Sequence, residues 1–105
     1  LSDFWKVIAL RRVAGLLRPG GILRLLDLVV DVAPDQVETT IEAWMARAAD
    51  DPARGYTADE FAEHLRSEFT TFTWLLEPML ERTGFEIVER EVRASIYTTY
   101  TCRRR

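Results

Sequence analysis

The run from Ile22 to Val30 constrains the fold of this chain more than any other feature. Seven of its nine residues are apolar, and they do not alternate with polar ones. A nearly continuous apolar run of strand length is typical of a strand covered on both faces, which usually lies inside a parallel sheet. The residues before it, Leu17-Arg18-Pro19-Gly20-Gly21, favour a tight reversal, because proline cannot continue a helix and glycine tolerates positive φ. We therefore expect a helix, a turn and a buried strand in residues 1–32.

Helical spacing predicts the other elements. Val7, Leu10, Val13, Ala14 and Leu17 share one face of a first helix, which Ser2 or Asp3 can cap. Three more helical stretches follow the strand, two of them with capping-box spacing, at Asp35 and Glu38 and at Thr57 and Glu60. Pro78 either kinks the last stretch or starts its final segment, and Gly84 is a C-terminal stop signal. We expect an inserted helical segment at 33–73 and a further helix from 74.

Two strand candidates close the chain, Phe85 to Val92 and Ile96 to Cys102, and they are near enough in sequence to form an antiparallel hairpin. The expected fold class is α/β, with one parallel-type strand and a terminal hairpin in residues 74–105. The strand Ile22 to Val30 is then expected to have no parallel partner within the chain. Its free edge invites pairing with another strand.

Composition excludes several classes of protein. The 105 residues, 48% hydrophobic and 30% charged, are typical of a single small globular domain. No apolar run approaches the roughly 20 residues that cross a bilayer, so we expect no membrane partner. One cysteine and one histidine are too few for a disulfide or a closed zinc site, which predicts a cytoplasmic protein without metal. The net charge of −3 argues against nucleic acid, with Arg103-Arg104-Arg105 as a local exception.

The order of these elements resembles the C-terminal half of the class I S-adenosylmethionine-dependent methyltransferases. Leu17-Arg18-Pro19-Gly20-Gly21 resembles the turn before the family's fifth strand, and Gly84-Phe85 resembles the step into its sixth. The resemblance covers nearly the whole chain. It implies the C-terminal part of a Rossmann-like methyltransferase fold, in which the last strand inserts antiparallel between the fifth and sixth strands.

The resemblance also implies what is missing. The family binds S-adenosylmethionine at a Gly-x-Gly turn after the first strand and at an acidic residue after the second, and neither motif is present here. The parent protein would carry that half, together with a parallel neighbour for Ile22 to Val30, before Leu1. We expect the chain alone to bind the cofactor weakly or not at all.

Ligands in open α/β sheets lie beyond the carboxyl ends of the parallel strands, which selects the candidate site residues. The resemblance places Asp3, Phe4 and Trp5 beside the cofactor, although an N-cap and two packing aromatics are the simpler interpretation. Asp27, near the end of a buried strand, is expected to be paired with a basic residue or to contact the methyl acceptor as a base.

Tyr97 and His64 complete the candidate catalytic set. Tyr97 begins the last strand and is expected near Asp27, with sheet packing as the alternative. His64 lies at the edge of its helix stripe, where it is either an acid or base in a substrate cleft or an ordinary surface residue. Aromatic residues of the insertion are expected to pack in the core or to cover an acceptor pocket: Trp44, Phe61, Phe69, Phe72 and Trp74.

Two functions follow as hypotheses. In the first, the chain belongs to a methyltransferase whose acceptor is a small molecule, and its partner is the missing N-terminal half. In the second, it is a non-catalytic α/β module that pairs with another chain, or with a second copy of itself, along the exposed edge of Ile22 to Val30.

Overall fold

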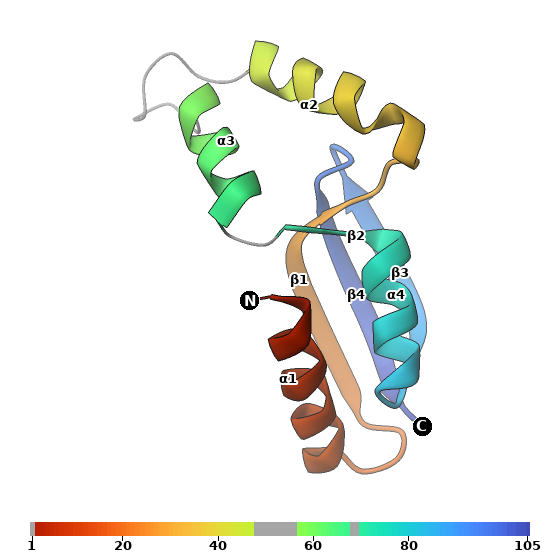
Figure 1. The fold of residues 1–105 in the computed structure, drawn as a ribbon. Helices are drawn as coiled ribbons and strands as arrows, with labels where there is room; N and C mark the ends of the chain where they lie inside the picture. Colours follow the sequence, from red (N-terminus) through yellow and green to blue (C-terminus); the bar gives the residue numbers. More distant parts are fainter. Residues whose placement is uncertain (1, 48–56, 68–69) are drawn as a thin grey trace. The chain divides into compact units, whose positions relative to one another are not determined.

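The computed structural model describes residues 2–47, 57–67 and 70–105 (Figure 1). The elements run in the order α1 (Asp3–Leu16), β1 (Ile22–Val30), the 3₁₀ helix η1 (Pro34–Gln36), α2 (Val37–Ala46), α3 (Ala58–Ser67), β2 (Thr71–Phe72), α4 (Thr73–Arg82), β3 (Phe85–Arg93) and β4 (Tyr97–Arg104). They form two compact units: unit 1 comprises Leu1–Asp31 and Thr71–Arg105, and unit 2 comprises Val32–Thr70. The predicted insertion at 33–73 thus differs from unit 2 by a few residues at either end.

Unit 1 is built on a four-stranded sheet with the order β2-β1-β4-β3. The last strand, β4, lies between β1 and β3 and is antiparallel to both, as expected for the terminal hairpin. The expectation that β1 has no parallel partner is wrong, because β2 pairs with it in parallel at Val29↔Thr71 and Val30↔Phe72. A two-residue strand leaves no periodic pattern, so the sequence assigned these residues to the insertion and to its last helix.

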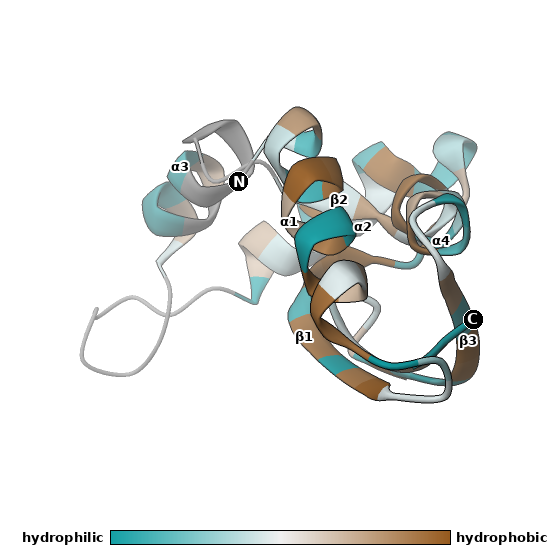
Figure 2. Ribbon diagram, turned by 90° about the horizontal axis from the view of Figure 1, so that it is seen from below, coloured by the Kyte–Doolittle hydropathy of each residue, from teal (hydrophilic) through white to brown (hydrophobic). Residues whose placement is uncertain are grey.

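The prediction that β1 is covered on both faces holds only at its end, where Val29 and Val30 point to opposite faces and are both buried. Figure 2 shows α1 and α4 on the same face of the sheet. On the other face, Ile22 and Leu26 are 51% and 65% exposed. We call this the open face. An apolar run of this kind indicates a strand whose two faces can both be covered. The part of unit 1 that the structure describes has helices on one face only.

The core lies between the sheet and these two helices. Its buried members come from every larger element of unit 1: Leu10, Ala14, Val29, Leu76, Leu80, Phe85, Tyr100 and Cys102. Alternation along β4 places Thr98, Tyr100 and Cys102 toward the core, and each is fully buried. Burial of a large apolar side chain contributes about 1.5–3 kcal/mol, so this cluster is the main source of the unit's stability.

The Pro-Gly-Gly turn joins α1 to β1 through backbone bonds to the end of the chain. Gly20 has φ +86° and donates its N–H to the carbonyl of Arg104 at 2.7 Å, and Arg104 returns its own N–H to Gly21. The Arg104 side chain also donates to the carbonyl of Ala14 at 2.7 Å, which satisfies a carbonyl near the C-terminus of α1. The turn therefore fixes both α1 and the β1–β4 register.

The helix signals are partly confirmed. The backbone N–H of Glu60 donates to Thr57 Oγ1 at 3.2 Å, as the capping-box spacing predicted. The box at Asp35 and Glu38 is not formed, because this stretch starts as η1 and α2 begins without a side-chain cap. In α4, Pro78 lies inside the helix, and Gly84 follows its end at φ +113°.

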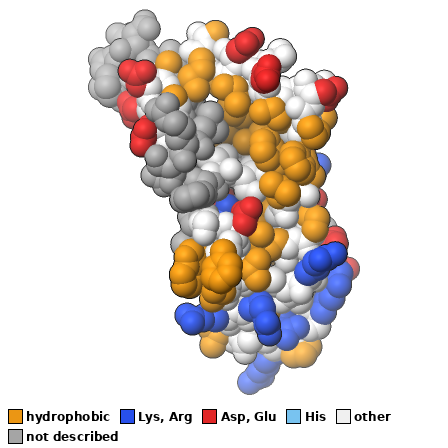
Figure 3. All heavy atoms as spheres, in the orientation of Figure 1, with side chains coloured by type: hydrophobic (Ala, Val, Ile, Leu, Met, Phe, Trp, Pro, Cys, Tyr) orange, Lys and Arg blue, Asp and Glu red, His pale blue; other side chains and the backbone are white. Residues whose placement is uncertain are grey.

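Charge is unevenly distributed along the chain. The ranges of unit 1 contain eleven Lys and Arg against eight Asp and Glu, although the whole chain is acidic. On the face drawn in Figure 3, basic side chains gather at the end of unit 1 where the Pro-Gly-Gly turn lies, away from the carboxyl end of β1. Within the described ranges, no helix has the length and apolar character needed to cross a membrane.

Candidate functional site

The carboxyl end of β1 gathers the ends of several elements of unit 1. The N-terminal end of α1, the strand β2, the start of α4 and the β3–β4 turn all lie toward this end (Figure 1). The backbone N–H of Asp31, directly after β1, donates to the carbonyl of Ser95 in that turn at 3.0 Å. This is the edge at which open α/β sheets hold their ligands.

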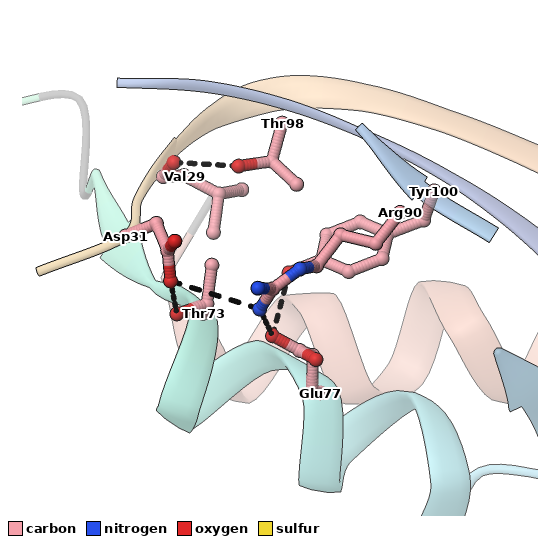
Figure 4. Close-up of polar contacts among 7 residues, drawn as sticks. All are labelled: Val29, Asp31, Thr73, Glu77, Arg90, Thr98 and Tyr100. Carbon is pink, nitrogen blue, oxygen red and sulfur yellow. Dashed lines mark hydrogen bonds and ion pairs between the residues drawn. The ribbon is translucent and has the colours of Figure 1, made fainter. Parts of the chain in front are cut away.

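The carboxylate of Asp31 is held by two side chains (Figure 4). Thr73, the first residue of α4, donates its hydroxyl to Asp31 Oδ1 at 2.9 Å. Arg90 of β3 places Nη1 3.6 Å from the same oxygen. The two contacts fix an acidic group, 37% exposed, at the carboxyl end of β1.

Arg90 is itself fixed by Glu77 of α4. Its Nη1 donates to Glu77 Oε2 at 2.9 Å, and the buried Tyr100 donates its hydroxyl to the same oxygen at 3.2 Å. The hydrogen bond to Glu77 raises the pKa of Arg90 above its usual range. Burial, and then the negative charge of Glu77, raise the pKa of Tyr100 well above its usual value. Both groups therefore keep their protons at neutral pH. Their contacts with Glu77 join α4, β3 and β4.

A further buried hydroxyl supports this cluster. Thr98, beside Tyr100 on β4, donates to the carbonyl of Val29 at 2.9 Å and is fully buried. Figure 4 shows how Asp31, Thr73, Glu77, Arg90 and Tyr100 converge between the sheet and α4. We call these five residues the Asp31 network. It can orient a carboxylate that accepts a hydrogen bond or a proton from a ligand. Among the described residues, no three His, Cys, Asp or Glu side chains gather as metal ligands.

Asp27 is placed differently from the prediction. It is exposed rather than buried, and its Oδ1 accepts the backbone N–H of Leu28 at 2.8 Å. It lies opposite Thr98 in the β1–β4 ladder, four residues before Asp31. The expectation of burial failed because α1 and α4 do not cover the sheet over this residue.

Tyr97 and Asp27 are not brought together on one face. Tyr97 lies opposite Leu28, the neighbour of Asp27, and successive side chains of a strand point to opposite faces. Tyr97 is 37% exposed, on the open face with Leu26 and Leu28. The closeness expected from the hairpin holds for the backbone and not for the side chains.

Asp3, Phe4 and Trp5 form the first turn of α1, at the expected edge of the sheet. Asp3 pairs with Lys6 at 3.8 Å, and no side-chain cap is present at Ser2. Phe4 and Trp5 meet edge to face with ring centroids 5.6 Å apart, yet they are 70% and 56% exposed. Core packing therefore does not explain these two rings within the described residues.

The remaining candidates belong to the insertion and to the start of α4. His64 lies in α3, but its side chain is outside the part that the structure describes, as is that of Phe61, and Phe69 lies outside it altogether. Trp44 is buried, as core packing predicts. Phe72 and Trp74 stack with ring centroids 4.8 Å apart, and Trp74 is 45% exposed.

Sequence reasoning missed the Asp31 network. A signal for Asp31 was present, because it is the first residue after the predicted strand and the ligand edge lies there. Arg90 and Glu77 gave none, since each is one of several charged residues on its element and they meet only when α4 packs on the sheet. Tyr100 was one residue among the Tyr and Thr of the last strand.

Comparison with known protein families finds no family model that matches this chain, and comparison with curated proteins also finds no match.

Proposed function

We propose that the chain is the C-terminal half of a class I S-adenosylmethionine-dependent methyltransferase whose parent transfers a methyl group to a small-molecule acceptor. The observation that carries the proposal is the strand order: β4 lies antiparallel between β1 and β3, which run in the same direction. The resemblance implied this arrangement for the same three segments. A fold alone does not define a reaction, so the proposal also depends on the residues at the carboxyl end of β1.

That edge supplies part of a site for cofactor and acceptor. Asp3, Phe4 and Trp5 would face the cofactor. The rings of Phe4 and Trp5 are exposed and therefore accessible to it. The residues present do not make a complete cofactor site, because no Gly-x-Gly turn occurs in the sequence.

On the acceptor side, Asp27, Tyr97 and His64 remain the candidates that the sequence predicts, and Asp31 joins them. A fixed carboxylate can accept the proton that a hydroxyl or amine acceptor loses when it is methylated. Asp31 lies at the end of β1 and is oriented by Thr73 and Arg90, so we rank it above Asp27 for this role.

The test is to express the chain together with the coding sequence that precedes Leu1 and to titrate both forms with S-adenosylhomocysteine. We expect saturable binding by the longer protein and weak or no binding by the 105-residue chain. A preceding sequence without four further strands and a Gly-x-Gly turn would rule the proposal out. Saturable binding by the short chain would contradict the incomplete site.

A second function has its own observation, the open edge of β1. Over Ile22–Leu28 the ladder of described residues pairs β1 with β4 alone, while β2 pairs only with Val29 and Val30. An unpaired strand edge is a template for another strand. In this proposal the chain is a non-catalytic α/β module that acts by association.

A further inference from the structure

The open edge of β1 can pair with the same edge of a second copy of the chain. It comprises the seven residues Ile22–Leu28, between the Pro-Gly-Gly turn and the first residue paired with β2. A closed dimer of identical chains is related by a two-fold axis, so the same edge must pair with itself. For two strands side by side, antiparallel pairing about an axis perpendicular to the sheet meets this condition and keeps both open faces on the same side.

The pleat then restricts the register. Opposed residues must point to the same face, so residues of β1 in even positions can oppose only other even positions, and odd only odd. The pairing is therefore centred on a single residue. A centre at Leu25 pairs the whole open edge, with Ile22 opposite Leu28, Leu23 opposite Asp27, and Arg24 opposite Leu26 of the second copy.

Charge excludes two of the neighbouring registers. A centre at Arg24 opposes two guanidinium groups, and a centre at Asp27 opposes two carboxylates, which is unfavourable in a sheet. A centre at Leu26 brings Leu23 opposite Val29, whose edge β2 already occupies. Among these registers, Leu25 uses the complete edge without opposing like charges.

The helix beside the edge fits the same arrangement. In both views α1 lies beside β1, on the core side of the sheet (Figures 1 and 2). Large apolar side chains are exposed at both of its ends: Phe4 and Trp5 at the start, and Leu16, 85% exposed, at the finish. A two-fold axis makes the two α1 helices antiparallel, so the start of each faces the finish of the other.

We propose that the 105-residue chain forms a two-fold dimer through antiparallel pairing of two β1 edges centred on Leu25. The occupant of the edge is a second copy of this chain. The proposal rests on the second function above, association through β1, and adds the partner, the symmetry and the register.

Charge substitution at Leu26 tests the register, because this exposed residue lies opposite Arg24 of the second copy. Sedimentation equilibrium should give about twice the chain mass of 12.1 kDa. L26E adds two cross-strand ion pairs and should tighten association by about tenfold, whereas L26K should weaken it by a similar factor. The charge swap R24E/L26K should restore the affinity. Equal affinities for L26E and L26K would overturn the proposal.

Disulfide trapping gives an independent measurement. Arg24 and Leu26 are both exposed on the open face, and the native Cys102 is buried. An equimolar mixture of R24C and L26C should form a cross-linked dimer on oxidation, while either variant alone should not. If the chain associates but this mixture does not cross-link, the register is wrong and the associative function stands. A chain that sediments as a monomer at millimolar concentration refutes both.

Discussion

At the scale of single residues, the Asp31 network shows how α4 is oriented on the sheet. Arg90 lies between two carboxylates, those of Glu77 and Asp31. Tyr100 of β4 donates a hydrogen bond to Glu77 of α4. A partly buried charge is unfavourable when its partner is removed. The network therefore specifies the placement of Asp31.

Replacing Arg90 tests this directly. R90M keeps most of the side-chain volume but leaves Glu77, 26% exposed, without its cation. We expect the free energy of unfolding to fall by about 1–2 kcal/mol in urea denaturation. The matched control is R103M, whose 3.7 Å ion pair with Glu86 joins two half-exposed side chains and should contribute under about 0.5 kcal/mol. Equal losses of unfolding free energy in R90M and R103M would show that the network contributes no more than an exposed ion pair.

Tyr100 gives the network a pH dependence at alkaline pH. Its pKa is raised in the folded chain, first by burial and then by Glu77, so the folded state keeps a proton that the unfolded state releases above about pH 10. The resulting stability is present below pH 10 and is lost as the pH rises further. Urea denaturation between pH 8 and about 11 should show this decline, and Y100F should flatten it. A parallel decline in Y100F would assign the effect to other groups.

At the scale of elements, the β3–β4 hairpin has an unusual turn. Ala94 and Ser95 have φ +54° and +59°, and Ile96 donates its N–H to the carbonyl of Arg93 at 3.2 Å. Two successive positive φ values are typical of a type I′ β-turn, which favours Asn and Gly because other residues are strained there. The last strand pair is Arg93↔Tyr97, so Ile96 is an additional residue of the connection. The Ser95 carbonyl accepts the Asp31 N–H, so the strained turn is tied to the candidate site.

Relieving that strain should stabilise the chain. A94N/S95G supplies the residues that the turn prefers and keeps the backbone bond to Asp31. We expect a gain of about 1 kcal/mol, seen as a rise in melting temperature of roughly 5 °C. A94V, which places a β-branched residue at positive φ, should lower the melting temperature instead. If A94N/S95G melts at or below the temperature of the native chain, the turn is not strained.

At the scale of the whole molecule, unit 1 contains the complete hydrophobic cluster of the sheet, α1 and α4. Its two chain segments meet where β1 and β2 pair, at Val29↔Thr71. Strand spacing puts Asp31 and Thr71 roughly 8 Å apart, a distance that a linker of about four residues spans. None of the described residues of Val32–Thr70 belongs to this cluster.

Replacing Val32–Thr70 with a short Gly-Ser linker should therefore leave unit 1 folded. We expect a cooperative thermal transition and slow amide exchange at Tyr100 and Cys102, the buried positions of β4. The control is the same replacement in an L80A background, which removes a fully buried core residue and should unfold at a lower temperature. Fast exchange at Tyr100 in the linker variant would show that unit 1 needs the inserted segment.

Much of the fold was predictable because its signals are local. The turn at Gly20 and the stop at Gly84 depend on backbone freedom, and the apolar run fixed β1 to the residue. The candidate site was predictable in its location, at the carboxyl end of β1, and less so in its residues. Asp27 points to the face that the helices cover and is nevertheless exposed, because a strand pattern does not say how much of that face the helices cover.

The sequence by itself determined the α-helices, the three long strands, their order and the hairpin, since periodicity, proline and glycine act on neighbouring residues. The tertiary structure alone decided that both helices pack on one face, that β2 pairs with the end of β1, and that Asp31 meets Arg90 and Glu77. Those contacts join residues far apart in the chain, and they depend on how whole elements pack.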